Sequence, residues 1–133
     1  MGLGIPVMGH IGFTPQYFKK FKVQGVSKKD AFKLMEQARK NQEAGVFSIV
    51  LECINEPIAK QITEKLRIPT IGIGASIHCD GQILVTDDML GLSGFYPKFV
   101  KKFVNLNNII ELGIEKYKKA VLNRSFPNKK NIF

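Results

Sequence analysis

The 133-residue chain contains no tryptophan, only two cysteines and few acidic residues. Cys53 and Cys79 match neither a metal-knuckle spacing nor a C-x-x-C pair, which excludes a disulfide-stapled miniprotein and a zinc finger. No stretch reaches the ~18 apolar residues of a membrane span, and the apolar N-terminal segment lacks a basic region and a cleavage site. We therefore expect a cytoplasmic protein with reduced thiols and no membrane partner.

The scarcity of acidic residues leaves the chain strongly basic. The chain has eleven Asp and Glu residues and twenty Lys and Arg residues, which gives a formal net charge of +9. Such a charge is typical of proteins that bind nucleic acid. However, the basic residues are nearly all lysines scattered along the chain, with no arginine cluster and no aromatic RNA-binding motif. We expect a solvated lysine surface and no nucleic-acid partner.

The remaining composition is that of one globular unit, because 44% of the residues are hydrophobic and no repeat or linker divides the chain. Four apolar segments of strand character are separated by segments with helical spacing. The expected strands are 4–12, 46–54, 68–75 and 81–87. The expected helices are one from Ser27 to the stop at Gly45, one from Glu56-Pro57 to Leu66, and a long one from Pro97 to Asn123, broken near 105–108. This order predicts an α/β fold on a parallel sheet.

Glu52 is the most informative position. Alternation along the second strand puts Val46, Ser48, Val50 and Glu52 on one face, and Phe47, Ile49, Leu51 and Cys53 on the other, which suits a covering helix. Glu52 lies at the carboxyl end of its strand, where sites form in parallel α/β folds. An apolar environment there would raise the pKa of its carboxyl and make it a general base. The alternative is a solvated acid beside the next helix.

His10 is expected toward the carboxyl end of the first strand, between Gly9 and Ile11. It could donate a hydrogen bond to a substrate oxygen or to a neighbouring carboxylate, or it could be a hydrogen-bonded structural histidine. Three adjacent residues, His78, Cys79 and Asp80, suggest a metal cluster, but adjacent side chains rarely converge on one ion.

Two further patterns remain open. Gly72 and Gly74 begin a dinucleotide-binding fingerprint that fails at Ile77, so they more simply allow a close approach at a strand end. Asp87 and Asp88 lie at the end of the last expected strand. They could form a cation site, or one of them could cap the next turn.

Six motifs together resemble the ketopantoate hydroxymethyltransferase family. They are, in order, GIPVMGHIGFTPQ at 4–16, FKVQG at 21–25, VLECI at 50–54, IPTIGIGAS at 68–76, CDGQILVTDDMLGL at 79–92 and PKFVKKF at 97–103. The resemblance implies a (β/α)8 TIM barrel of the phosphoenolpyruvate/pyruvate superfamily type. At this length only its C-terminal half, strands 5 to 8, is present, because a whole barrel takes ~250 residues. We expect residues 1–123 to form this half and 124–133 a polar tail.

The same resemblance implies the chemistry. Members transfer a hydroxymethyl group from 5,10-methylenetetrahydrofolate to 3-methyl-2-oxobutanoate, giving 2-dehydropantoate for pantothenate synthesis, and the bacterial form is a decamer. Mg²⁺ holds the keto acid while the glutamate of the LEC motif, here Glu52, accepts the C3 proton; His10 is a possible pocket residue. The metal ligands are expected in the absent half, so we expect this chain alone to be inactive. Ser76 stands where the family usually has glycine.

Two readings of the half-length chain stay open. One is a part of a full-length enzyme. The other is a truncated, non-catalytic remnant or assembly partner. In either case, an isolated half barrel would leave Val46, Val50 and two sheet edges exposed, so we expect it to self-associate or aggregate.

Overall fold

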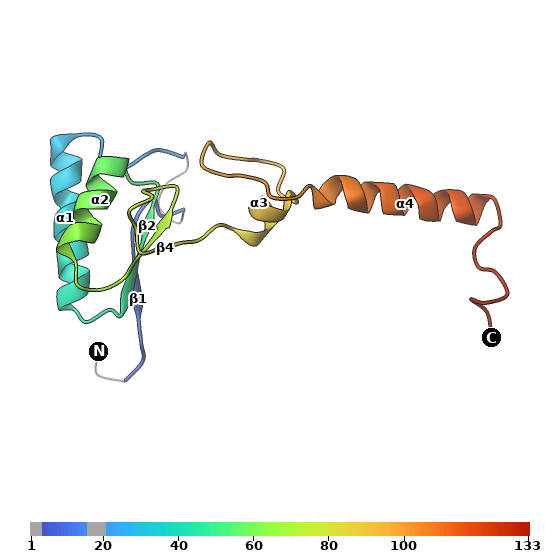
Figure 1. Ribbon diagram of the computed structural model, residues 1–133, viewed down its shortest axis with the longest axis horizontal. Helices are drawn as coiled ribbons and strands as arrows, with labels where there is room; N and C mark the ends of the chain where they lie inside the picture. Colours follow the sequence, from blue (N-terminus) through green and yellow to red (C-terminus); the bar gives the residue numbers. More distant parts are fainter. Residues whose placement is uncertain (1–3, 16–20) are drawn as a thin grey trace. The chain divides into compact units, whose positions relative to one another are not determined.

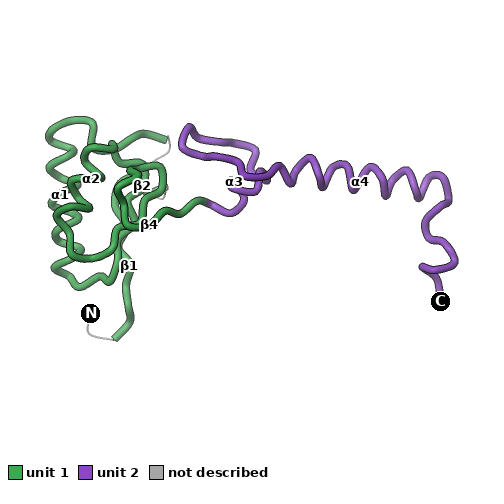
Figure 2. The backbone as a smooth tube through the Cα atoms, viewed as in Figure 1, with its two compact units in different colours: residues 1–84 green, residues 85–133 purple. Residues whose placement is uncertain are grey.

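The computed structural model describes residues 4–15 and 21–133, so Gln16 of the first motif lies outside the described residues. The chain forms two compact units, residues 1–84 and 85–133 (Figure 2). The predicted domain boundary after residue 123 stays a prediction. Within the described ranges, no helix is long and apolar enough to cross a membrane.

The first unit contains four strands and two helices. In chain order they are β1 (Met8–Gly12), α1 (Lys28–Glu43), β2 (Ser48–Glu52), α2 (Glu56–Lys65), β3 (Thr70–Ile73) and β4 (Gly81–Gln82). The strands form one sheet in the order β1-β2-β3-β4, and every pairing is parallel. The predicted parallel α/β architecture is therefore confirmed, while closure into a (β/α)8 barrel stays a prediction.

Both helices begin and end where the sequence predicts. The hydroxyl of Ser27 accepts a hydrogen bond from the backbone N–H of Asp30 at 3.1 Å, which caps α1. Gly45, with φ 82°, follows the end of that helix. A proline lies in the first turn of α2. Backbone N–H groups in the first turn have no partner within the helix, so a proline, which lacks an N–H, loses no hydrogen bond there.

The two helices lie side by side on one face of the sheet (Figure 1). Their buried residues form the core with the sheet side chains that face them. This core consists of Ile11, Leu34, Ala38, Ile49, Leu51, Ile54, Ala59, Ile62 and Cys79. Ile49 and Leu51 therefore lie on the helix-covered face, as predicted, and burying a side chain of that size contributes about 1.5–3 kcal/mol.

Three predictions on β2 are wrong. Val46 and Val50, expected to be exposed, are only 6% and 8% exposed. For Val50 the reason is local: His10 and Ile71 lie directly beside it on the neighbouring strands. Phe47, expected under a helix, is 52% exposed because it precedes the strand. Cys53 is buried but is not part of the helix-side core, since its backbone leaves the strand conformation with φ 49°.

The second unit contains α3 (Thr86–Leu90) and α4 (Leu106–Leu122). The strand expected to reach residue 87 ends at Gln82, because β3 offers β4 pairing partners only at Ile71 and Gly72. The helix expected from Pro97 begins at Leu106. Before it, the N–H of Phe103 donates to the carbonyl of Met89, so that segment bonds to the end of α3 instead of coiling.

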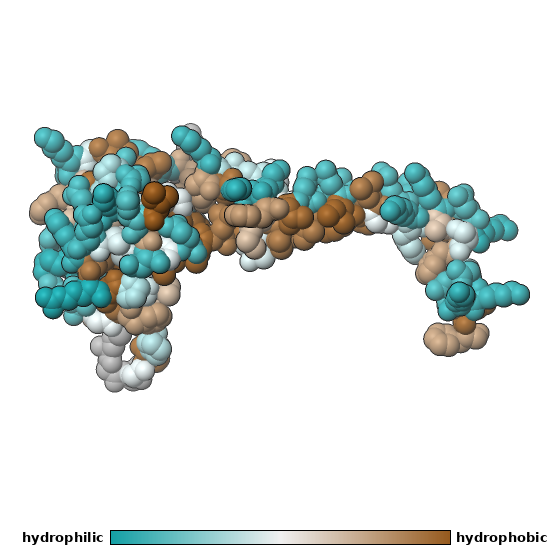
Figure 3. Space-filling model, viewed as in Figure 1, coloured by the Kyte–Doolittle hydropathy of each residue, from teal (hydrophilic) through white to brown (hydrophobic). Residues whose placement is uncertain are grey.

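Apolar side chains along α4 are exposed, including Ile109, Ile110, Ile114 and Tyr117, each about half exposed or more. Figure 3 shows this hydrophobic surface running along the helix.

Candidate functional site

The structure brings together His10, in the middle of β1, and Glu52, at the carboxyl end of β2. Glu52 pairs with Gly12 in the parallel register. His10 lies two residues before Gly12 on β1, so its side chain is on the same face of the sheet as that of Glu52. His10 Nε2 lies 3.0 Å from Glu52 Oε2, the distance of a charge-assisted hydrogen bond from the imidazole N–H to the carboxylate. Donation to a neighbouring carboxylate, one of the alternatives for His10, is thus what the structure contains.

The side chain of Glu52 is more enclosed than that of His10. It is only 13% exposed, whereas that of His10 is 40% exposed. Burial raises the pKa of the Glu52 carboxyl above its ordinary value, and the neighbouring His10 only partly offsets this effect. Among the described residues, the contact found for the Glu52 carboxylate is the one between its Oε2 and His10.

A small cavity of about 250 Å³ lies beside His10. Gly12 and Thr14 contribute to it from the end of β1, and Gln24, Lys33 and Gln37 line its other side. The cavity is mostly polar in its lining residues and is large enough for a molecule of a few heavy atoms. Of the His10–Glu52 pair, His10 lines this cavity and Glu52 does not.

The loop after β3 does not gather a metal site. The Asp80 carboxylate accepts hydrogen bonds from the backbone N–H and the hydroxyl of Thr70, at 2.8 and 2.9 Å. Cys79 Sγ lies 3.9 Å from the Thr63 hydroxyl, and His78 Nε2 lies 3.8 Å from Glu56 Oε1. The three adjacent side chains thus have three different partners, and the convergence on one ion that their adjacency suggested does not occur.

The structure also bears on the predictions made for Gly72 and for Asp87 and Asp88. The close approach at Gly72 is made by side chains, because a Cβ there would lie 2.9 Å from Gln82 Oε1 and 3.0 Å from Cys79 Sγ, whereas the expected approach of backbone or ligand stays a prediction. Asp87 and Asp88 do not extend a strand. They lie in the first turn of α3, where negative charge is favourable for a helix N-terminus.

A cluster around Ser76 was missed from the sequence. Ser76 is 5% exposed, its hydroxyl donates to Glu56 Oε1 at 3.2 Å, and it accepts the backbone N–H of His78 at 3.1 Å. Gln82 Nε2 also donates to the Ser76 carbonyl at 2.7 Å. A serine at the position where the family usually has glycine was the available signal, and here it ties the loop after β3 to the start of α2.

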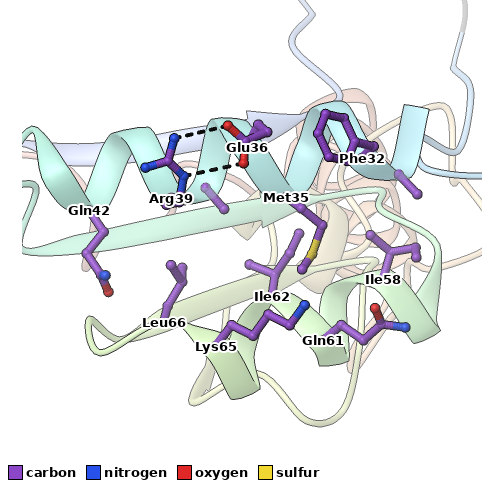
Figure 4. A pocket seen from close by; sticks show the side chains of 12 residues that line it. Phe32, Met35, Glu36, Arg39, Gln42, Ile58, Gln61, Ile62, Lys65 and Leu66 are labelled. Atoms are coloured by element: carbon purple, nitrogen blue, oxygen red, sulfur yellow. Dashed lines mark hydrogen bonds and ion pairs between the residues drawn. The ribbon is translucent and has the colours of Figure 1, made fainter. Parts of the chain in front are cut away.

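A groove of about 470 Å³ lies elsewhere, between α1 and α2 (Figure 4). Met35, Ile58 and Ile62 form its apolar floor, and an ion pair of Arg39 with Glu36, at 3.1 Å, lies at its edge. Neither His10 nor Glu52 lines this groove. Its size alone therefore gives no reason to place the chemistry there.

Comparison with known proteins identifies relatives over the whole chain. The sequence profile described as ketopantoate hydroxymethyltransferase matches residues 1–129. The chain is 51% identical to 3-methyl-2-oxobutanoate hydroxymethyltransferase 2 of Zymomonas mobilis, over 98% of this chain and 49% of that protein. It is 53% identical to the 3-methyl-2-oxobutanoate hydroxymethyltransferase of Thermosipho africanus, over 100% of this chain and 52% of the relative.

A protein of the same name from Clostridium botulinum is 56% identical over 97% of this chain and 48% of its own length. The chain therefore spans about half the length of the curated relatives it matches.

Proposed function

Because this chain belongs to the ketopantoate hydroxymethyltransferase family, we propose that it supplies half of an enzyme that transfers a hydroxymethyl group to 3-methyl-2-oxobutanoate. The donor is 5,10-methylenetetrahydrofolate, water supplies the hydroxyl oxygen, and the product is 2-dehydropantoate, a pantothenate precursor. The observation that carries the proposal is the buried Glu52 carboxylate paired with His10 at the carboxyl edge of the sheet.

Glu52 is the proton acceptor in this proposal. Its carboxylate takes the C3 proton of the keto acid, and the electrons of the broken C–H bond pass into the enolate that forms the new C–C bond. Burial favours this role, because a carboxyl whose pKa is raised toward neutral pH is a stronger base than an ordinary one. In this proposal Oε1 offers the lone pair, since Oε2 is engaged by His10.

His10 orients the carboxylate of Glu52 in this proposal. Its N–H holds one carboxylate oxygen and so restricts rotation of the carboxyl plane. Loss of this bond would leave the carboxylate with a less defined direction and would raise its pKa further, because His10 lowers that pKa.

The family also implies Mg²⁺. Among the described residues, no three His, Cys, Asp or Glu side chains come close enough together to hold a metal ion. These residues alone do not fit a magnesium site, and no step above passes through the metal. We propose that its ligands come from the other half of the enzyme, that the complete enzyme is a cytoplasmic homo-oligomer, a decamer, and that the chain by itself is inactive.

The experiment combines this chain with a separately expressed N-terminal half of a relative, such as the 53% identical Thermosipho africanus protein. Exchange of the keto acid's C3 proton with deuterated water isolates proton removal from the folate chemistry. We expect exchange only when both halves are present. Glu52→Gln keeps the shape and removes the basicity, so it should lower the exchange rate by about 100- to 10,000-fold.

The matched control is Glu64→Gln, at an exposed position on α2, which should leave the rate unchanged. Exchange at the unaltered rate by Glu52→Gln would remove Glu52 as the base and make His10 the leading candidate. Hydroxymethyl transfer by this chain alone would refute its proposed inactivity.

A second candidate is a short protein without catalysis, which persists as an assembly partner or remnant. The half-length match to the relatives motivates it. The intact mass of the native polypeptide separates the two: a species of 14.9 kDa supports the short protein, and a species near twice that mass supports the complete enzyme.

A further inference from the structure

Cys53 has an unusual backbone for a residue that directly follows the candidate base. Its φ is 49°, in the left-handed region that residues with a Cβ rarely adopt. Such a conformation persists only where the surrounding structure holds it, and it concentrates at functional sites. Arg124, in the C-terminal segment, is the other described non-glycine residue with positive φ.

Hydrogen bonds hold both peptide planes that flank Cys53. In the plane before it, the Glu52 carbonyl accepts the N–H of Phe13 at 2.8 Å, and the Cys53 N–H donates to the Ile73 carbonyl at 2.9 Å. In the plane after it, the Cys53 carbonyl accepts the N–H of Gln24 at 2.8 Å. With both planes fixed by neighbouring segments, the rotation at Cys53 is determined by its surroundings.

This rotation changes which side chain enters the core. Strand alternation would have placed Cys53 under the helices, yet Ile54 takes that place at 1% exposure. The Cys53 thiol remains buried near the Glu52 carboxylate: its pKa is raised to about 11, mainly by burial and further by the charge of Glu52. The thiol is therefore neutral at physiological pH and adds a small, weakly polar neighbour to the site.

We propose that Cys53 is a positioning residue for Glu52: its left-handed backbone, held on both peptide planes, ends β2 at Glu52 and fixes the carboxylate against His10. The proposal rests on the proposed role of Glu52 as proton acceptor. It assigns the effect to the backbone conformation at Cys53, and the thiol is not required for it.

The test measures the Glu52–His10 pair directly, by NMR titration of the 133-residue chain carrying ¹³C-labelled glutamate and ¹⁵N-labelled histidine. Cys53→Ala removes the thiol but tolerates the left-handed conformation about as well as cysteine. Cys53→Val adds β-branching, which disfavours that conformation strongly. We expect the alanine variant to keep the titration midpoint of Glu52 and its coupling to His10. In the valine variant the Glu52 midpoint should shift toward the ordinary glutamate value and the coupling should be lost.

Cys53→Gly covers the case in which the valine variant does not fold. Glycine adopts positive φ freely, so this variant should melt at a higher temperature than the alanine variant and keep the His10 coupling. Equal titrations of the valine and alanine variants would overturn the proposal. So would loss of the coupling in a folded glycine variant, or a glycine variant that melts below the alanine variant.

Failure of the proposed function would look different. Unaltered proton exchange by Glu52→Gln would remove the catalytic role of Glu52, whereas the titrations would still decide whether Cys53 orients it.

Discussion

Replacement of Gly12 by alanine should destabilise the first unit more than any ordinary surface change. Gly12 ends β1 with φ 99°, and an added Cβ would lie 2.1 Å from the Glu52 carbonyl oxygen and 2.8 Å from Ile54 Cγ1. The positive φ costs an L-residue about 1–2 kcal/mol. The contact with a backbone atom cannot be relieved by a side-chain rotation, so β1 must move away from β2.

That movement would also break the hydrogen bond from the Phe13 N–H to the Glu52 carbonyl, worth about 1 kcal/mol net. The sum is a loss of about 3 kcal/mol, a large part of the ~5–15 kcal/mol that stabilises a typical domain. Urea unfolding followed by far-UV circular dichroism measures it, at one fixed protein concentration because association shifts apparent stability.

Gly9→Ala is the matched control in the same strand. Its added Cβ would meet the end of the Asn41 side chain at 2.7 Å, which can rotate away, and Ile49 Cγ1 at 3.2 Å, which must give by only a few tenths of an ångström. We expect a loss below about 1 kcal/mol there, as for most tolerated substitutions. If Gly12→Ala and Gly9→Ala were equally stable, the reasoning from backbone contact at Gly12 would be wrong.

Three other outcomes are expected. Ser27→Ala removes the cap of α1 and should lower the unfolding free energy by about 1 kcal/mol in urea, with Ser125→Ala, in the exposed C-terminal segment, as a neutral control. Hydrogen bonds from Thr70 lower the pKa of Asp80, so its contribution to stability is present above the unfolded-state pKa and is lost as pH falls through the folded-state pKa. Unfolding midpoints from neutral pH to about pH 3 should therefore fall less steeply for Asp80→Asn, and equal slopes would refute this. The chain should self-associate with concentration in sedimentation, less so when Ile110 and Ile114 on α4 are both changed to lysine; a monomer at every concentration would contradict it.

Local signals predicted the parts of the fold that local chemistry decides. The Ser27 cap, the stop at Gly45 and the proline at the start of α2 each act within a few residues, and both helices lie where these signals put them. Strand alternation placed Ile49 and Leu51 correctly because both edges of β2 pair with neighbouring strands and the helices cover the face that carries these two residues.

The failures lie where a distant segment decides the conformation. The left-handed turn at Cys53 depends on hydrogen bonds to Gln24 and Ile73, which no local pattern reveals. The early end of β4 depends on how much of β3 is available for pairing. In the candidate site, the position of Glu52 at the end of β2 was predictable, whereas His10 lies in the middle of β1 and its 3.0 Å contact with Glu52 depends on the register between two strands.

The sequential strand order has a consequence for how the sheet assembles during synthesis. Ile71 pairs with Gly81, 10 positions away, Ile49 with Thr70, 21 positions away, and Met8 with Ser48, 40 positions away. The entropic free-energy cost of closing a loop rises by about 0.6 kcal/mol for each doubling of loop length. Pairing β1 with β2 therefore costs about 1.2 kcal/mol more than pairing β4 with β3. The β1–β2 pairing is thus the costliest of the three closures. Until β2 has been translated, β1 and its His10 lack the partner strand that this unit supplies, and an unpaired strand edge is prone to aggregation.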